Sequence, residues 1–225
     1  MRPDWPALMP AAIVGLMSEP CTLVVYGDYK SPYAYLAKDL IYELAEAVPV
    51  RLDWRPYVLD IPSYLGSAVV DRAGRVLEES RNAHQWRRVR YSYMDCRREA
   101  RKRGLTIRGT QKIWDSHLAA AGMVYALEAG EPVFRRYNDA VFDRFWRREL
   151  DIEDPVVLEG VLVSAGAPPG FEARIPALRS EVTRICREAE EQGVFGVPSF
   201  VLEGELFWGR EHLPELRGRL AGRRG

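Results

Sequence analysis

A junction near the start of the chain, where an apolar run leads directly into a helix signal, most constrains how this sequence can fold. Residues 23–36 read LVVYGDYKSPYAYL. The run before Gly27 has the β-branched and aromatic composition of a buried strand, and Ser31-Pro32 is typical of a helix N-cap followed by proline at the first helical position. The sequence therefore predicts a strand that passes at Ser31 into an amphipathic helix over residues 33–47.

The beginning of that helix favours negative charge. The N–H groups of a first helical turn have no partner within the helix, and the aligned peptide dipoles place positive potential in front of them. Ser31 puts a hydroxyl in this field. Two interpretations are open from this stretch alone: Ser31 only caps the helix, or it forms part of a binding site.

A second stretch, close to the C-terminus, predicts a hairpin that is entered through a proline. Residues 193–209 read GVFGVPSFVLEGELFWG, a Gly-Val-Pro turn that leads into two short apolar strands separated by Glu203-Gly204. Residues 50–57 alternate like another strand. With the first strand and helix they form a βαβ unit, whose crossover is expected to be right-handed.

The segment between these two parts has a helical pattern throughout, after a Gly- and Pro-containing loop at residues 60–74. The predicted helices there cover about 78–103, 112–129, 132–148 and 155–164, and two more follow at 171–192 and 211–219. The predicted organisation is an N-terminal extension at 1–20, a first half-domain at 21–76, a helical insertion at 77–166 and a second half-domain at 167–225.

Charge and hydropathy exclude several kinds of partner. The 225 residues include 32 basic and 32 acidic side chains, so no net field steers the protein onto nucleic acid or an anionic membrane. The basic run at 97–103 is interpreted as the solvated end of a helix. No segment approaches the length needed to span a membrane, and the N-terminal 17 residues lack the pattern of a signal peptide.

Cysteines and histidines are few and scattered. They are Cys21, Cys96, Cys186, His84, His117 and His212. This spacing favours neither a disulfide framework nor a metal site, and it suits a reducing cytoplasm. Ser31 also has no adjacent general base and no Gly-x-Ser-x-Gly elbow, which argues against a serine nucleophile.

Two motifs in this order resemble a known superfamily. They are YKSPYAYL at 29–36 and GVFGVPSF at 193–200, the latter followed by ELFWG at 205–209. Together they resemble the DsbA-like superfamily, and within it 2-hydroxychromene-2-carboxylate isomerases and kappa-class glutathione transferases. The similarity covers about residues 22–220. It implies a thioredoxin-like α/β fold with a mixed sheet and an all-helical insertion domain, and a cis bond before Pro198.

The resemblance also bears on the chemistry at Ser31. Disulfide oxidoreductases of this fold carry Cys-x-x-Cys at the helix start, and here Ser31 and Ala34 occupy those two places, so ordinary thiol–disulfide exchange is excluded. The helix dipole contributes about 0.3–2 kcal/mol to a bound anion. With the hydroxyl it is enough to lower the pKa of a bound thiol from about 8.5 towards 7. Reduced glutathione is the thiol that the resemblance implies.

Further positions acquire expected roles from the same resemblance. Ser31 is expected to be catalytic, by stabilising the glutathione thiolate. Glutathione is expected to contact the backbone of Val197, like an added strand, together with Pro198, Lys30 and the pair Arg210-Glu211. The expected substrate-pocket residues are Tyr33, Arg55 and Trp208.

The predicted function is that of a cytoplasmic glutathione-dependent isomerase or transferase acting on a small aromatic or electrophilic compound. By analogy with relatives, a homodimer is expected. Two alternatives stay open. One is a divergent DsbA-family protein, oxidoreductase-like but without redox cysteines, that uses the pocket for another thiol or anion. The other is a non-catalytic thioredoxin-like protein that binds peptides along the edge formed by Val197-Pro198.

Overall fold

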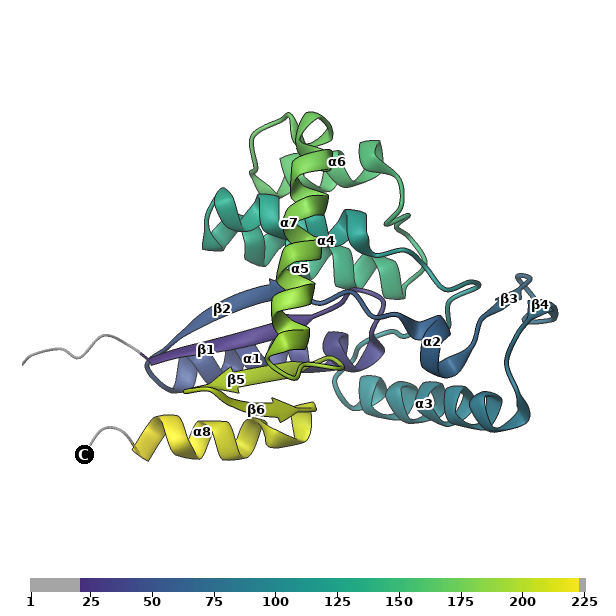
Figure 1. Cartoon of the computed structure of the whole chain (residues 1–225), viewed down its shortest axis with the longest axis horizontal. Helices are drawn as coiled ribbons and strands as arrows, with labels where there is room; N and C mark the ends of the chain where they lie inside the picture. Colours follow the sequence, from purple (N-terminus) through teal and green to yellow (C-terminus); the bar gives the residue numbers. More distant parts are fainter. Residues whose placement is uncertain (1–20, 223–225) are drawn as a thin grey trace, which may run out of the picture.

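The computed structural model describes residues 21–222, and the predicted extension at 1–20 lies outside this range (Figure 1). Its centre is a four-stranded mixed sheet with the strand order β2-β1-β5-β6. The strands are β1 (Cys21–Gly27), β2 (Val50–Pro56), β5 (Ser199–Leu202) and β6 (Glu205–Trp208). β1 is parallel to β2 and antiparallel to β5, which forms the predicted hairpin with β6. The mixed α/β class expected from the sequence is confirmed.

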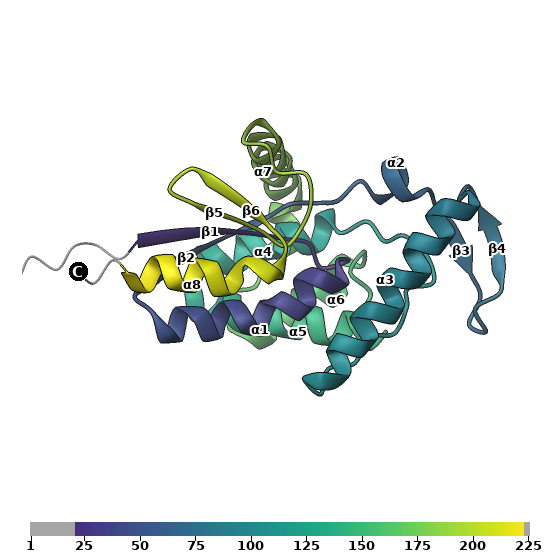
Figure 2. The same ribbon diagram turned by 90° about the horizontal axis from the view of Figure 1, so that it is seen from below.

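Helices cover both faces of this sheet. α1 (Pro32–Ala47) and α8 (Leu213–Ala221) lie on one face, and the long α7 (Phe171–Glu191) crosses the other (Figures 1 and 2). A short 3-10 turn, η1 (Arg210–His212), connects β6 to α8. The C-terminal helix predicted from residue 211 therefore begins as this tighter turn.

The inserted helices form the rest of the molecule. α4 (His117–Glu128), α5 (Glu131–Trp146) and α6 (Pro155–Ala165) pack on one another, and α4 packs along α7. α3 (Ala83–Lys102) extends beyond this group, next to the start of α1 (Figure 2). In residues 21–222, no helix combines the length and apolar character needed to cross a bilayer.

The segment before α3 differs from the sequence prediction. Residues 60–74, expected to be a loop, contain α2 (Ile61–Leu65) and β3 (Ala68–Val70). The expected start of a helix at about residue 78 is wrong, because it is too early: residues 76–79 form β4 (Val76–Glu79), paired with β3. The Asp71 carboxylate accepts the N–H groups of Ala73 and Arg75 and closes the turn that joins the two strands. α3 begins only after Asn82, which caps it together with Gln85.

Aromatic rings join α1 to the inserted helices around the start of α1. Tyr35 stacks on Phe142 and Trp146 of α5, with ring centroids 5.8 and 6.4 Å apart. Tyr29, just before α1, contacts Phe142 at 4.7 Å. Each such pair contributes about 0.5–1.5 kcal/mol beyond the area it buries. The chain on both sides of Ser31 is thereby fixed against α5, within a core that includes sheet and insertion alike.

Candidate functional site

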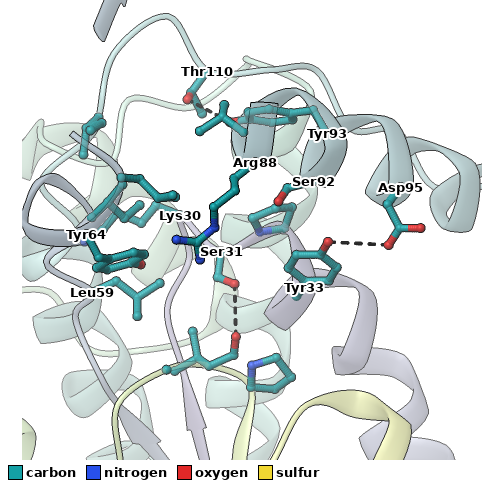
Figure 3. Close-up of a pocket in the computed structure, with 18 of the residues that line it drawn as sticks. Lys30, Ser31, Tyr33, Leu59, Tyr64, Arg88, Ser92, Tyr93, Asp95 and Thr110 are labelled. Atoms are coloured by element: carbon teal, nitrogen blue, oxygen red, sulfur yellow. Dashed lines mark hydrogen bonds between the residues drawn. The ribbon is translucent and has the colours of Figure 1, made fainter. Parts of the chain in front are cut away.

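Ser31 is the N-cap of α1 and lies at the bottom of the site. Its Oγ accepts the N–H of Ala34 at 3.2 Å, and Pro32 occupies the first helical position, as the sequence predicts. The same Oγ donates to the carbonyl of Val197 at 3.5 Å (Figure 3). Capping and contact with a distant segment are therefore both roles of this buried hydroxyl.

The distant segment is the loop that leads into β5. The peptide bond between Val197 and Pro198 is cis. A hydrogen bond stabilises this loop, because the Ser199 Oγ donates to the carbonyl of Gly196 at 2.7 Å. A Cβ atom at Gly196 would lie only 2.6 Å from Nε1 of Trp208, so glycine lets this indole pack against the loop. The loop is thus held between the sheet and the aromatic side chain that precedes η1.

A cavity of about 790 Å³ opens at this junction. Its walls come from the start of α1, from residues 59–65, from α3, from residues 110–114, and from the loops around Val197 and Gly209. Most of the predicted site residues line it: Lys30, Ser31, Tyr33, Val197, Pro198, Trp208, Arg210 and Glu211. The structure therefore brings together side chains from both ends of the sequence.

Arg55 is the exception among the predicted site residues. It does not line the cavity. Its guanidinium lies at the end of β2, where Nη2 and Nε donate to the Asp53 carboxylate at 2.7 and 3.1 Å. Burial opposes the charge of Arg55, but the bonds to Asp53 prevail and raise its pKa. The predicted role in the substrate pocket does not agree with this position.

Lys30 lies inside the cavity wall with its charge already compensated. Its Nζ is 3.1 Å from Asp28 Oδ2 and donates to Ser116 Oγ at 2.9 Å. Both partners of the ion pair are nearly inaccessible, with 5% and 1% of their side chains exposed. Asp28 also accepts the backbone N–H groups of Lys30 and Leu59. This buried pair fixes the loop before Ser31, and its ammonium is not free to pair with another anion.

Arg88 is a cavity residue that sequence reasoning missed. It projects from α3 towards the space in front of Ser31 (Figure 3). No acceptor or carboxylate within residues 21–222 bonds to its guanidinium. Ser92 and Asp95 follow it on the same face of α3, four and then three residues later. That polar stripe is visible in the sequence, but nothing there shows that it faces Ser31.

The other cations of the cavity have partners. Arg210 Nη2 lies 3.3 Å from Glu99 of α3, which joins η1 to that helix. Lys112 pairs with Glu153, and Arg81 Nε donates to the carbonyl of Leu65 at 3.1 Å. Arg81 bonds only to backbone carbonyl groups, so among the described cavity cations Arg81 and Arg88 have no carboxylate partner, and Arg88 is the one directed towards Ser31 (Figure 3).

Glu211 has its carboxylate folded against the chain. Gly209 precedes it with φ of +105°, a conformation that favours glycine, and a Cβ atom there would collide with the Glu211 carboxylate. This acidic group lines the same cavity as Arg88, although they come from elements far apart in sequence. The site therefore offers the Glu211 carboxylate and the Arg88 guanidinium, while the other carboxylate of the cavity lining, Asp95, pairs with Arg98.

Two tyrosines provide neutral hydroxyl groups. Burial, reinforced by the Cys96 thiol, holds the pKa of Tyr33 well above that of free tyrosine, and its hydroxyl donates to Asp95 at 3.5 Å (Figure 3). Burial also raises the pKa of Tyr64 to about 12, with nearby Asp28 acting in the same direction. Both phenols stay protonated near neutral pH, and Tyr64 can donate a hydrogen bond to a ligand, whereas the single hydroxyl proton of Tyr33 is donated to Asp95.

No thiol of the described chain belongs to the cavity lining. Cys96 lies behind Tyr33, and burial raises its pKa to about 12. Burial likewise raises the pKa of Cys186. Such thiols are poor nucleophiles at neutral pH. Residues 21–222 also contain no group of three histidine, cysteine or acidic residues that could hold a metal ion.

The mixed sheet, the serine at the start of α1 and the loop with the cis bond before Pro198 define a thioredoxin-like α/β protein. The chain belongs to the DsbA-like thioredoxin family, because the model of the DSBA-like thioredoxin domain matches residues 22–221. A curated relative, the 2-hydroxychromene-2-carboxylate isomerase of Sphingobium xenophagum, is 26% identical over 204 residues. That alignment covers 88% of this chain and 97% of the relative.

Solved structures show the same fold at lower identity. A 2-hydroxychromene-2-carboxylate isomerase superimposes with a TM-score of 0.68 at 22% identity, covering 90% of this chain and 97% of the other. A probable DsbA oxidoreductase from Streptomyces coelicolor gives 0.69 at 19%, covering 91% and 92%. The cytosolic disulfide reductase DsbM from Pseudomonas aeruginosa, in a structure with GSH, gives 0.57 at 18%, covering 90% and 98%.

Proposed function

We propose that this protein binds reduced glutathione at Ser31 and acts as a glutathione-dependent isomerase or transferase on a small aromatic or electrophilic compound. The observation that carries the proposal is the position of the Ser31 hydroxyl, at the N-terminus of α1, 3.5 Å from the Val197 carbonyl and on the wall of a large cavity. The likeness to an isomerase over nearly the whole chain supports the reaction class.

The residues of the cavity fit glutathione. Glutathione carries a thiol, one ammonium group and two carboxylates. Glu211 would accept the ammonium, and Arg88 has donors free for a carboxylate. The backbone of Val197 would pair with the cysteine residue, as an added strand does. Trp208 and Trp114 give the same cavity apolar walls for an aromatic substrate.

When bound, glutathione supplies a thiolate that adds to an activated carbon of the substrate and leaves again after rearrangement. Ser31 would hold the sulfur in its charged form by turning its hydroxyl proton from the Val197 carbonyl to the thiolate, while the N–H groups of the first turn of α1 add a favourable field. Tyr33 and Tyr64 remain neutral; Tyr64 donates to an oxygen atom of the substrate, while the hydroxyl proton of Tyr33 is donated to Asp95. Arg88 orients an anionic group, since Lys30 is committed to Asp28.

The decisive experiment is a calorimetric titration with reduced glutathione across neutral pH. The wild-type protein is expected to bind and release a proton, because the bound thiol has a lowered pKa. Ser31→Ala should bind about tenfold more weakly, which corresponds to about 1.4 kcal/mol. Ser180→Ala, which alters an exposed serine of α7, is the matched control and should bind normally.

A further variant separates the two roles of Ser31. Ser31→Asp retains a side-chain acceptor that can cap α1, so the fold should survive, but its charge repels a thiolate. Burial of the new carboxylate beside the Val197 carbonyl should lower Tm, so the check on the fold is a retained cooperative transition, and we expect no glutathione binding. Isomerisation of 2-hydroxychromene-2-carboxylate, followed by absorbance with and without glutathione, then tests the reaction itself. The proposal would be contradicted if the wild-type protein did not bind glutathione at millimolar concentration. It would also be contradicted if Ser31→Ala bound glutathione with the same affinity as the wild type.

A further inference from the structure

A second hollow, of about 490 Å³, lies on the other side of α3 from Ser31. α3 forms one wall, and the β3–β4 hairpin and residues 109–113 contribute the others. We call it the arginine groove. Among the described residues that line it there is no carboxylate, but there are six cations: Arg81, Arg90, Arg97, Arg101, Lys112 and Arg148. Of these, Lys112 is paired with Glu153, and the five arginines form no ion pair within the described chain. This is unexpected in a chain whose charges cancel overall.

Helical spacing places much of this charge on one face of α3. Trp86, Arg90, Tyr93, Arg97 and Arg101 follow one another at intervals of three or four residues. Like charges four residues apart, as at Arg97 and Arg101, repel each other and destabilise a helix. Nothing on this face of α3 offsets that repulsion, because no carboxylate in residues 21–222 forms an ion pair with any of these arginines.

The neighbouring cations of the same basic run behave differently. Arg98 pairs with Asp95, Lys102 with Glu99 at 2.7 Å, and Arg103 with Glu43 at 2.6 Å. None of these paired residues lines the groove. Arg97 and Arg101 are exposed, as expected for a solvated helix end, but they line the groove and pair with no carboxylate of the described chain.

Backbone carbonyl groups hold the guanidinium groups in place without cancelling their charge. Arg97 Nε donates to the carbonyl of Ile107 at 3.3 Å, and Arg148 Nε donates to that of Gly109 at 2.6 Å. A Cβ atom at residue 109 would lie 3.1 Å from Arg97 Nη2, so glycine allows the close approach of this side chain. Two guanidinium groups are thus anchored at one short segment of chain, with donors left over.

Aromatic rings lie close to three of the groove's arginines. The guanidinium groups of Arg81 and Arg90 lie 5.0 and 5.7 Å from the Trp86 ring, and that of Arg97 lies 5.5 Å from Tyr93. The indole N–H of Trp86 donates to Glu79, whose carboxylate is outside the groove lining. The groove therefore combines positioned, uncompensated guanidinium groups with apolar surface, and its volume exceeds that of a simple inorganic anion.

We propose that the arginine groove binds a small phosphorylated organic molecule that carries at least two negative charges. Planar guanidinium groups match phosphate oxygens in pairs, and several of them converging on one hollow suit adjacent phosphate groups. The aromatic surface would contact the organic part. Tyr93 and Lys112 line both this groove and the cavity at Ser31, so the ligand would border the candidate active site. The assignment does not depend on glutathione binding.

The test is a calorimetric titration of the full chain with sodium pyrophosphate, at an ionic strength of about 0.15 M to screen distant charges. We expect saturable binding at one site. The double variant Arg90→Gln/Arg101→Gln should bind at least about tenfold more weakly, since both side chains are exposed and line the groove. Arg87→Gln removes one charge from α3 outside the groove, the same change as either single variant Arg90→Gln or Arg101→Gln, and should have less than about a twofold effect.

Melting curves of the three proteins check that the fold is retained, and each single variant replaces the double variant if that one fails to fold. An equal loss of pyrophosphate affinity in Arg87→Gln would show that binding depends only on the overall positive charge of α3, and it would overturn the proposal. So would the absence of pyrophosphate binding in the wild type. A single-stranded oligonucleotide that binds more tightly, and is weakened by the same two substitutions, would instead make the groove part of a nucleic-acid surface.

Discussion

The buried ion pair between Asp28 and Lys30 gives a sharp prediction about stability. At their separation of 3.1 Å, an effective dielectric constant of about 20 gives an attraction of about 5 kcal/mol, much of which offsets the loss of hydration. Asp28→Asn keeps the shape of the side chain but leaves the Lys30 ammonium buried and uncompensated. Breaking a buried pair in this way costs about 3–5 kcal/mol.

Lys30→Met should destabilise less than Asp28→Asn. The Asp28 carboxylate would keep the two backbone N–H donors of residues 30 and 59, and only its pairing with the ammonium is lost. We expect about 1–3 kcal/mol. In the double variant neither charge remains, so the combined effect should fall short of the sum of the single effects by about 1–3 kcal/mol.

Urea unfolding followed by circular dichroism measures these differences, with the slope checked to be unchanged. Asp53→Asn is the matched control, because it breaks the pair with Arg55, in which about a third of each side chain is exposed, and such pairs contribute about 0–1 kcal/mol. If Asp28→Asn destabilises no more than this control, the account of the pair beneath Ser31 is wrong.

Three other predictions concern the core, acid stability and thiol reactivity. Gly122→Ala should lower stability by about 1–3 kcal/mol in urea, since its Cβ would collide with the buried Tyr137 hydroxyl, despite the better helix propensity of alanine. Backbone N–H groups at the start of α7 lower the pKa of Glu159 below 4.5, so its stabilising effect is present above about pH 4.5 and is lost as the pH falls. Glu159→Gln should therefore flatten the decline of Tm with acid, and an unchanged profile would contradict this. Cys96, with its pKa near 12, should escape alkylation by iodoacetamide at about pH 8 until the protein unfolds, as peptide mapping can show.

Local chemistry made the two ends of the fold predictable. Ser31-Pro32 specify a helix start through a cap and a fixed φ, and the structure places the helix there. Glu203 and Gly204 both adopt positive φ, of 52° and 82°, at the tip of the predicted hairpin. These signals depend only on a few neighbouring residues, so they can be recognised without knowledge of the tertiary contacts.

The parts that the sequence did not predict depend on distant contacts. Val76–Glu79 has no strong preference between helix and strand, and its pairing with β3 decides the matter. The exposure of Arg88 to the cavity depends on how α3 is rotated against α1, which no local pattern encodes. Arg55 was assigned to the pocket from the family resemblance, but at the end of β2 its side chain pairs with Asp53.

The order of strands in the sheet has a consequence for synthesis on the ribosome. β1 can pair with β2 soon after both strands emerge, but the other edge of β1 stays unpaired until β5 has been synthesised. Ser31 likewise precedes Val197, which it contacts, by 166 residues. Long-range pairing of this kind is slow, and an unpaired strand edge invites association with other chains. A nascent chain that stops before residue 199 therefore carries most of its helices but neither a complete sheet nor a site, and it is the form most in need of a chaperone.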